Sequence, residues 1–245
     1  MITYLANPVR FQRFARYASP ILGGLAIIAL LVGLYLSLIA SPAERDQGDA
    51  VRIMYVHVPA VWTAMAAYAA MAISSLIAYI WRHPLADELA RSFALPGAAF
   101  TALGLLTGGI WGKTSWGTFW QWDGRMTSTL ILLFLFIGYM AVWAAIEDKR
   151  RAARIAGLVA MVGSINLPII KYSVDWWNSL HQSASVSSID APGMPFSMLL
   201  PLLLMGIGYS FFLGWIVLSR MLSKVDEAQN RRRPRAKSKA SMEAL

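Results

Sequence analysis

Residues 111–125 read WGKTSWGTFWQWDGR and join two apolar runs, 93–111 and 126–146, each long enough to cross a lipid bilayer. The segment contains four of the ten tryptophans: Trp111, Trp116, Trp120 and Trp122. Tryptophan collects at membrane–water interfaces, so anchoring in an aromatic belt is one interpretation. Four rings beside three glycines and an acid exceed what a belt needs, which favours a surface for a flat ligand.

A helical conformation would give this segment two aromatic faces. At about 100° per residue, Trp116, Trp120 and Asp123 share one face. Trp111 and Trp122 share roughly the opposite face. One face could grip the bilayer while the other receives the ligand, so we expect a Trp-rich amphipathic segment.

The composition places the chain among integral membrane proteins. Hydrophobic residues make up 57% of the 245 residues and charged residues only 14%. There is no cysteine, which excludes disulfides, thiolate metal sites and a covalent C-x-x-C-H haem attachment. The net charge of +9 does not indicate a nucleic-acid partner, because the basic residues concentrate at the ends of apolar runs and in the tail.

Six apolar segments of about 20 residues predict an all-α protein with six transmembrane helices. Their approximate ranges are 20–40, 58–81, 93–111, 126–146, 153–171 and 197–219. The first is longer than the apolar core of a signal peptide, so we expect an uncleaved anchor. No segment carries a charged residue in its middle, which argues against the alternative of an ion- or proton-coupled secondary transporter of a small solute.

The basic residues predict the orientation, because cytoplasmic loops are rich in Lys and Arg. With both termini in the cytoplasm, 17 of the 22 Lys and Arg residues lie inside. Residues 41–57, 112–125 and 172–196 then face the outer, periplasmic side. We expect one membrane domain over 1–222 and a basic, disordered cytoplasmic tail over 223–245, attracted to anionic lipid heads.

The three histidines differ in position. His57, at the start of the second span, and His181, in the loop after the fifth, fall on the outer side with the Trp-rich segment, whereas His83 falls in a cytoplasmic loop. A lone histidine is most often only hydrogen-bonded or solvated, but two that converge on one aromatic surface favour a ligand site. Asp123 in such a surface needs a partner: it could orient Arg125, accept an indole N–H, or cap a helix near Gly124.

Three separated motifs resemble a known family. They are MYVHVPAVW at 54–62, WGKTSWGTFWQWD at 111–123 and INLPIIKYSVDWWNSLHQ at 165–182. The second is similar to the tryptophan-rich WWD signature of haem-handling proteins, and the order of all three resembles cytochrome c maturation protein C (CcmC), the haem exporter protein C family. The likeness covers most of the chain.

The resemblance implies a function and a set of site residues. The chain would bind haem b as transient cargo at the outer face of the bacterial inner membrane. His57 and His181 would be the axial ligands of the iron, and the four tryptophans and Asp123 would surround the haem. Arg52 and Arg125 are candidates to pair with the haem propionates; headgroup contact is their alternative.

The resemblance also implies the partners of the chain. The acceptor of the haem would be the periplasmic chaperone CcmE. The other partners would be the ABC transporter subunits CcmA and CcmB and the small membrane subunit CcmD. The segment GGIWGKT lacks the first glycine of a phosphate loop, so we expect no ATPase in this chain. The resemblance implies ligation and hand-over of haem without its conversion, so we also expect no enzyme activity.

Overall fold

The computed structural model describes residues 7–177, 179, 181 and 194–242. This part of the chain is almost entirely helical and contains no strand. The helices are α2 (Pro8–Tyr35), α3 (Met54–Trp81), α4 (Pro84–Trp116), α5 (Gly124–Ala145), α6 (Lys149–Gly163), α7 (Asn166–Trp176) and α8 (Phe196–Met242). A π-helical turn, Leu36–Ala40, extends α2, and a 3-10 turn, Asp49–Ile53, leads into α3. The all-α prediction is confirmed.

Six helical stretches are long and apolar enough to cross a membrane, as the sequence predicts. Their bounds are Pro8–Ala40, Asp49–Trp81, Leu85–Trp116, Gly124–Ala145, Lys149–Trp176 and Phe196–Asn230. Most extend beyond the apolar run that marks them. The first begins at Pro8 because the Asn7 side chain accepts the backbone N–H of Val9 (2.9 Å) and so caps the helix there.

The fifth span is made of two helices. After α6 the chain passes through Ser164 and Ile165 before α7 begins at Asn166. The Asn166 amide Nδ2 donates to the carbonyl of Ser128 in α5 (2.8 Å), which fixes the break against its neighbour. The break falls beside Asn166 and Pro168, and proline is a common cause of such kinks.

Helix α8 does not end at residue 222, where the sequence analysis places the boundary between the membrane domain and the tail. The helix continues to Met242. Val225 is buried, and Asp226 accepts a hydrogen bond from Gln12 Nε2 of α2 (2.6 Å), so the bundle includes the turns just beyond residue 222. A packed helix can lengthen without forming a new nucleus, so even charged residues with good helix propensity extend it.

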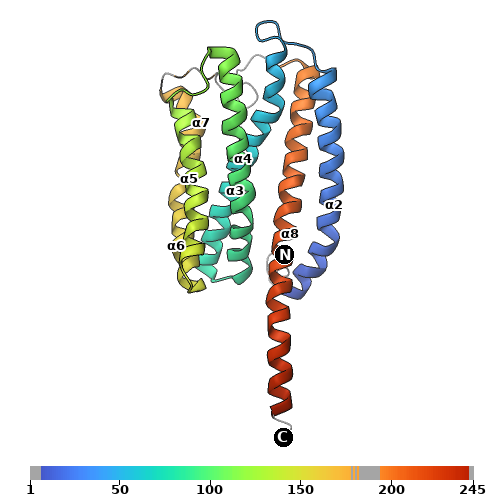
Figure 1. The fold of residues 1–245 in the computed structure, drawn as a ribbon, viewed down its shortest axis with the longest axis vertical. Coiled ribbons are helices and arrows are strands. Elements are labelled where there is room, and N and C mark those ends of the chain that lie inside the picture. Colours follow the sequence, from blue (N-terminus) through green and yellow to red (C-terminus); the bar gives the residue numbers. More distant parts are fainter. Residues whose placement is uncertain (1–6, 178, 180, 182–193, 243–245) are drawn as a thin grey trace.

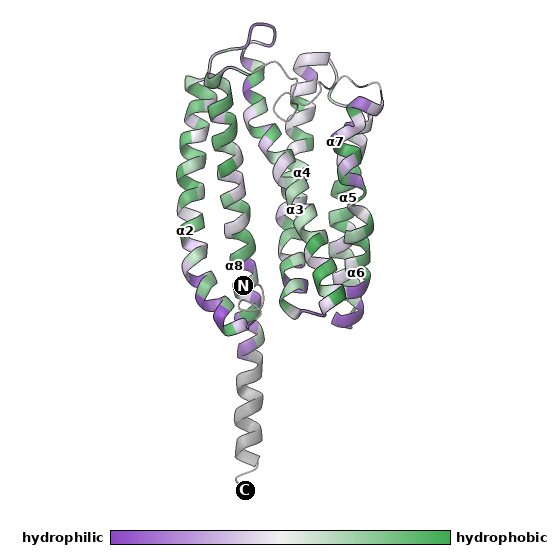
Figure 2. Ribbon diagram, turned by 180° about the vertical axis from the view of Figure 1, so that it is seen from behind, coloured by the Kyte–Doolittle hydropathy of each residue, from purple (hydrophilic) through white to green (hydrophobic). Residues whose placement is uncertain are grey.

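The helices form a bundle with two distinct ends (Figure 1). Helices α2 and α8 pack along each other, α3 packs against α4, and α5 packs against α4, α6 and α7. Hydrophobic residues fill the middle of the spans and hydrophilic ones gather toward both ends (Figure 2). We call the end that carries His57 and His181 the histidine end; the α3–α4 and α5–α6 turns lie at the opposite end.

Candidate functional site

His57 is held in one orientation by the backbone of α4. Its Nδ1 lies 3.0 Å from the carbonyl oxygen of Gly104 and 3.2 Å from Thr107 Oγ1. The Thr107 hydroxyl donates to the carbonyl of Leu103 (2.7 Å), and a carbonyl oxygen can only accept. The proton of a neutral His57 ring therefore resides on Nδ1, which leaves Nε2 with a free lone pair.

Small residues of α4 make room for this imidazole. A Cβ atom at Gly108 would lie 2.8 Å from His57 Cε1, closer than side chains tolerate. One turn further on, the Trp111 ring meets His57 edge-on, with centroids 5.7 Å apart. The indole Nε1 of Trp111 donates to Gln47 Oε1 (2.7 Å), which fixes the ring.

His181 is held in a similar manner by a carboxylate. Its Nδ1 lies 2.6 Å from Asp123 Oδ2, and the Ser179 hydroxyl donates to the same oxygen. The Trp116 ring meets His181 edge-on at a centroid distance of 4.8 Å. Each imidazole thus has an acceptor at Nδ1 and a tryptophan of α4 at its side.

Asp123 is buried and serves two elements at once. Its Oδ1 accepts the backbone N–H of Met126 (2.8 Å) and caps the start of α5. Burial raises the pKa of Asp123, but the bonds from Ser179 and Met126 and the neighbouring His181 outweigh this and hold the pKa below its usual value. The carboxylate is therefore ionised and accepts a hydrogen bond from the Nδ1–H of His181.

His181 is neutral because its ring is largely buried. Burial lowers the pKa of His181 below its usual value, although the charge and hydrogen bond of Asp123 act in the opposite direction. Arg125 contributes to the lowering. A neutral ring with its proton on Nδ1 leaves Nε2 available to a metal, and a carboxylate behind a ligand histidine is a common arrangement in metal sites.

Arg125 lies within electrostatic range of both histidines. It interacts electrostatically with His57 and with His181, and the two imidazoles also interact with each other. Asp123 and Asp175 lie near enough to balance its charge. His181 and Asp123 are thus in direct contact, and His57 and Arg125 lie within electrostatic range of them; that these four residues form one site stays a prediction.

The remaining predicted site residues lie in different surroundings. Arg52 donates through Nη1 to the carbonyl of Leu38, and its Nε pairs with Asp49 (3.0 Å). It therefore connects the π-helical turn after α2 with the 3-10 turn before α3. Trp120 meets Trp122 edge-on at 5.3 Å, and Trp122 is 75% exposed. The Trp120 Nε1 is buried and has no hydrogen-bond acceptor among the described residues. The roles of Arg52, Trp120 and Trp122 in binding stay predictions.

The Trp-rich segment is not one helix. Helix α4 ends at Trp116, Gly117 adopts a left-handed conformation with φ of 79°, and the chain is irregular up to Asp123. The continuous helix on which the shared face of Trp116, Trp120 and Asp123 depends is therefore not present. Glycine ends helices readily in this conformation, and Trp116 and Asp123 meet instead through His181.

The sequence analysis missed several residues that shape the site, namely Gln47, Gly104, Thr107, Gly108 and Ser179. One signal was present: Gly104 and Gly108 form a G-x-x-x-G pattern, which is typical of close helix contacts in membranes. Gln47 and Ser179 lie in loops, where no periodic pattern marks them.

The fold and this site define a class of protein: a six-span helical membrane protein with two oriented imidazoles and aromatic rings at one end. The model of one family, Heme exporter protein C (CcmC), matches residues 1–237. The chain belongs to the haem exporter protein C family.

Three relatives are similar to this chain over most of their length. A Heme exporter protein C of Bradyrhizobium diazoefficiens is 47% identical over 221 residues, which cover 90% of this chain and 84% of the relative. That of Escherichia coli K12 is 43% identical over 181 residues, 74% of each chain. A ccmC-like mitochondrial protein of Marchantia polymorpha, named for cytochrome c biosynthesis, is 43% identical over 81% of this chain and 84% of the relative.

Proposed function

We propose that this chain binds haem at the histidine end and serves haem export in c-type cytochrome biogenesis. The observation that carries the proposal is that both imidazoles use Nδ1 for a fixed acceptor. Both Nδ1 atoms face acceptors, a carbonyl for His57 and a carboxylate for His181, so both Nε2 atoms are free to coordinate iron. The family to which the chain belongs supports the choice of haem over another metal.

The groups around the histidines suit a porphyrin. Trp111 and Trp116 provide aromatic surface beside the imidazoles, where the flat ring of haem b can pack. Arg125 supplies a positive charge for a propionate. The buried Trp120 N–H, without an acceptor among the described residues, is a second donor for a cargo oxygen.

The proposed haem is cargo, and this chain is not an enzyme in our proposal. The histidine end faces the periplasm, both termini lie in the cytoplasm, and the haem passes to the chaperone CcmE. Energy coupling comes from the ABC subunits CcmA and CcmB, with CcmD as the small membrane subunit. The names of the bacterial relatives as exporters support this placement in a haem export complex.

The histidines themselves provide the test. His57→Ala and His181→Ala should each change the absorption spectrum of haem bound to the purified chain and lower loading of the acceptor. Their effects should be non-additive, because both act on one iron. Free imidazole should partly restore each single variant by filling the vacant coordination position.

His83→Ala is the matched control, because His83 precedes α4 at the opposite end of the bundle. This variant should keep the wild-type spectrum and loading. A double variant His57→Ala/His181→Ala with a wild-type haem spectrum and normal loading would refute ligation by these residues.

A further inference from the structure

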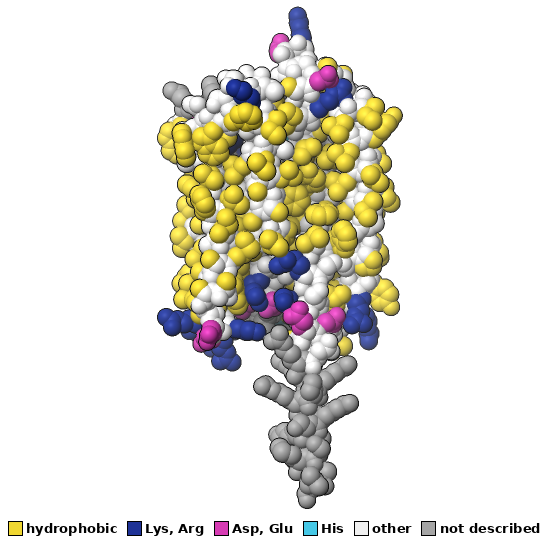
Figure 3. Space-filling view, in the orientation of Figure 1, with side chains coloured by type: hydrophobic (Ala, Val, Ile, Leu, Met, Phe, Trp, Pro, Cys, Tyr) yellow, Lys and Arg dark blue, Asp and Glu magenta, His cyan; other side chains and the backbone are white. Residues whose placement is uncertain are grey.

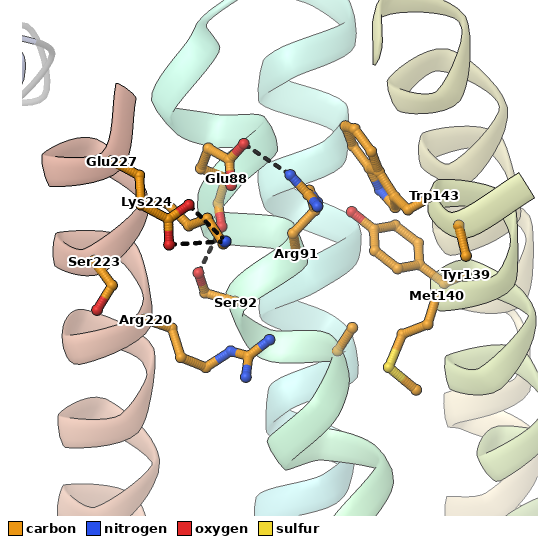
Figure 4. A pocket seen from close by; sticks show the side chains of 12 residues that line it. Glu88, Arg91, Ser92, Tyr139, Met140, Trp143, Arg220, Ser223, Lys224 and Glu227 are labelled. Atoms are coloured by element: carbon orange, nitrogen blue, oxygen red, sulfur yellow. Dashed lines mark hydrogen bonds and ion pairs between the residues drawn. The ribbon is translucent and has the colours of Figure 1, made fainter. Parts of the chain in front are cut away.

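A cavity of ≈480 Å³ lies between α4, α5 and α8, at the end of the bundle opposite the histidines. Figure 4 shows its lining, with charged side chains from α4 and α8 and aromatic ones from α5. On this face, basic and acidic side chains gather below the hydrophobic band (Figure 3). Neither the haem site nor the predicted motifs account for this cavity, which we call the charged cavity.

Positive charge exceeds negative charge in the lining. Glu88 pairs with Arg91 (2.9 Å), and Glu227 pairs with Lys224 (3.1 Å). Arg220 is the third cation, and its Nε is buried without a hydrogen-bond acceptor among the described residues. A guanidinium nitrogen can only donate, so this buried Nε needs an acceptor, and a bound anion would provide one.

The opposite wall of the charged cavity is apolar and aromatic. Trp143 lies under the guanidinium of Arg91, with 4.2 Å from Arg91 Cζ to the ring centroid, and Met140 and Tyr139 line the same wall. An anion that fits both walls has a charged head and an apolar body. An isolated inorganic anion would leave the apolar wall without a partner.

A second cavity, of ≈460 Å³, lies between α3, α4 and α8, nearer to the middle of the spans. It is lined by apolar and small residues of α3, α4 and α8, among them Trp62, Phe93 and Leu203. On α4, Phe93 borders this apolar cavity while its neighbours Ser92 and Ala94 border the charged cavity.

The two cavities share one stripe of α8. Gly206, Leu213 and Arg220 are seven residues apart, which places them on one side of the helix. Leu213 and Arg220 are separated by about 10 Å along the axis at 1.5 Å per residue. This is within the reach of an acyl chain whose headgroup sits at Arg220.

We propose that the charged cavity binds the phosphate headgroup of an anionic membrane phospholipid, with Arg220 as the principal phosphate ligand. One acyl chain lies along α8 toward the apolar cavity. Lys224 and Arg91 add positive charge around the head, and the site is a specific lipid site at the bundle end opposite the haem site. Basic pockets between membrane helices suit anionic headgroups in this manner.

Native mass spectrometry of the full chain after detergent exchange tests the proposal. The wild type should retain phosphatidylglycerol and release phosphatidylcholine, and added phosphatidylglycerol should raise its unfolding temperature. Arg220→Gln should reduce phosphatidylglycerol retention about tenfold or more, because a charge-assisted hydrogen bond is lost. Arg220→Lys should retain an intermediate amount.

Arg151→Gln is the matched control, since Arg151 is an exposed cation at the start of α6, at the same end and outside both cavities. It should retain lipid as the wild type does. Equal loss in both variants, equal retention of phosphatidylcholine, or equal protection by inorganic phosphate would each overturn a specific phospholipid site. An altered haem spectrum in Arg220→Gln with unchanged lipid retention would also overturn it. If Arg220→Gln fails to fold, the comparison of phosphatidylglycerol, phosphatidylcholine and inorganic phosphate on the wild-type protein still tests the proposal.

Discussion

Single atoms decide what the two histidines can do. Both rings use Nδ1 for a fixed acceptor, and their neutral form therefore presents Nε2. The two histidines could be identified from sequence as candidate ligands, because imidazoles near tryptophans on one side of a membrane are unusual. The acceptors could not: Asp123 and His181 are 58 positions apart, and their contact depends on how two loops fold together.

Acid should release haem, and the direction of this pH effect follows from the lowered pKa values of His181 and Asp123. Burial keeps the folded-state pKa of His181 below the ordinary value of about 6.5, and the pKa of Asp123 is lowered as well. The neutral imidazole and ionised carboxylate thus persist above about 6.5, and the arrangement is lost as the pH falls below that value. Absorbance of the bound haem, followed in a pH titration, should be constant at neutral pH and decline only in acid; release on raising the pH would contradict this assignment.

The carboxylate of Asp123 should contribute to haem binding as well as to stability. Asp123→Ala removes a helix cap worth about 1 kcal/mol and also the partner that orients His181. Loss of such a partner typically weakens metal affinity about 10- to 100-fold, and we expect a similar loss of haem affinity. Haem titration and thermal unfolding of the purified variant measure the two effects separately.

Asp148 offers a control with the same cap and no histidine. It caps α6 at the opposite end through the backbone N–H of Arg150 (2.9 Å). Asp148→Ala should lower the unfolding temperature by a similar amount and leave haem affinity unchanged. Equal haem affinity in the two variants would mean that Asp123 acts only as a cap.

At the scale of elements, α4 brings the site together. Gly104 and Gly108 let α3 approach closely enough for His57 to reach the α4 backbone, and Trp111 and Trp116 follow on the same helix. The existence of this helix follows from its apolar run. Its end at Trp116 does not, because the Trp-rich sequence continues past Gly117 without a change in composition.

Gly108→Ala should therefore disturb the site more than the fold. The new methyl group would meet His57 Cε1 at 2.8 Å and displace the ring, at a cost of about 1–3 kcal/mol for overpacking. Haem retention should fall while the protein still inserts and remains helical by circular dichroism. Gly138→Ala in α5 is the control: nothing lies within 4 Å of its added methyl group, so haem retention should be unchanged and stability equal or higher by up to about 1 kcal/mol.

At the scale of the whole molecule, the bundle separates two sites to its two ends. The histidine pair lies where α3 and α5 begin and α4 ends, and the charged cavity lies among the other ends of α4 and α5 and the later turns of α8 (Figures 1 and 4). Hydropathy predicts the six spans because each must present apolar side chains to lipid. It does not predict their exact length, since helices continue past the hydrocarbon wherever a cap or a packing partner supports them, as at Asn7 and Asp226.

The orientation of the bundle gives the last prediction. Of the 22 basic residues, 17 belong to the segments at the end opposite the histidines, and cytoplasmic loops carry such an excess. The chain has no cysteine, so single-cysteine variants report one position each. Ser115, at the histidine end, and Glu147, between α5 and α6, suit this test because both are exposed. Ser115→Cys should react with a membrane-impermeant thiol reagent in intact cells, whereas Glu147→Cys should react only after permeabilisation. The reverse pattern would place the histidine pair in the cytoplasm and rule out delivery of haem to a periplasmic acceptor from this site.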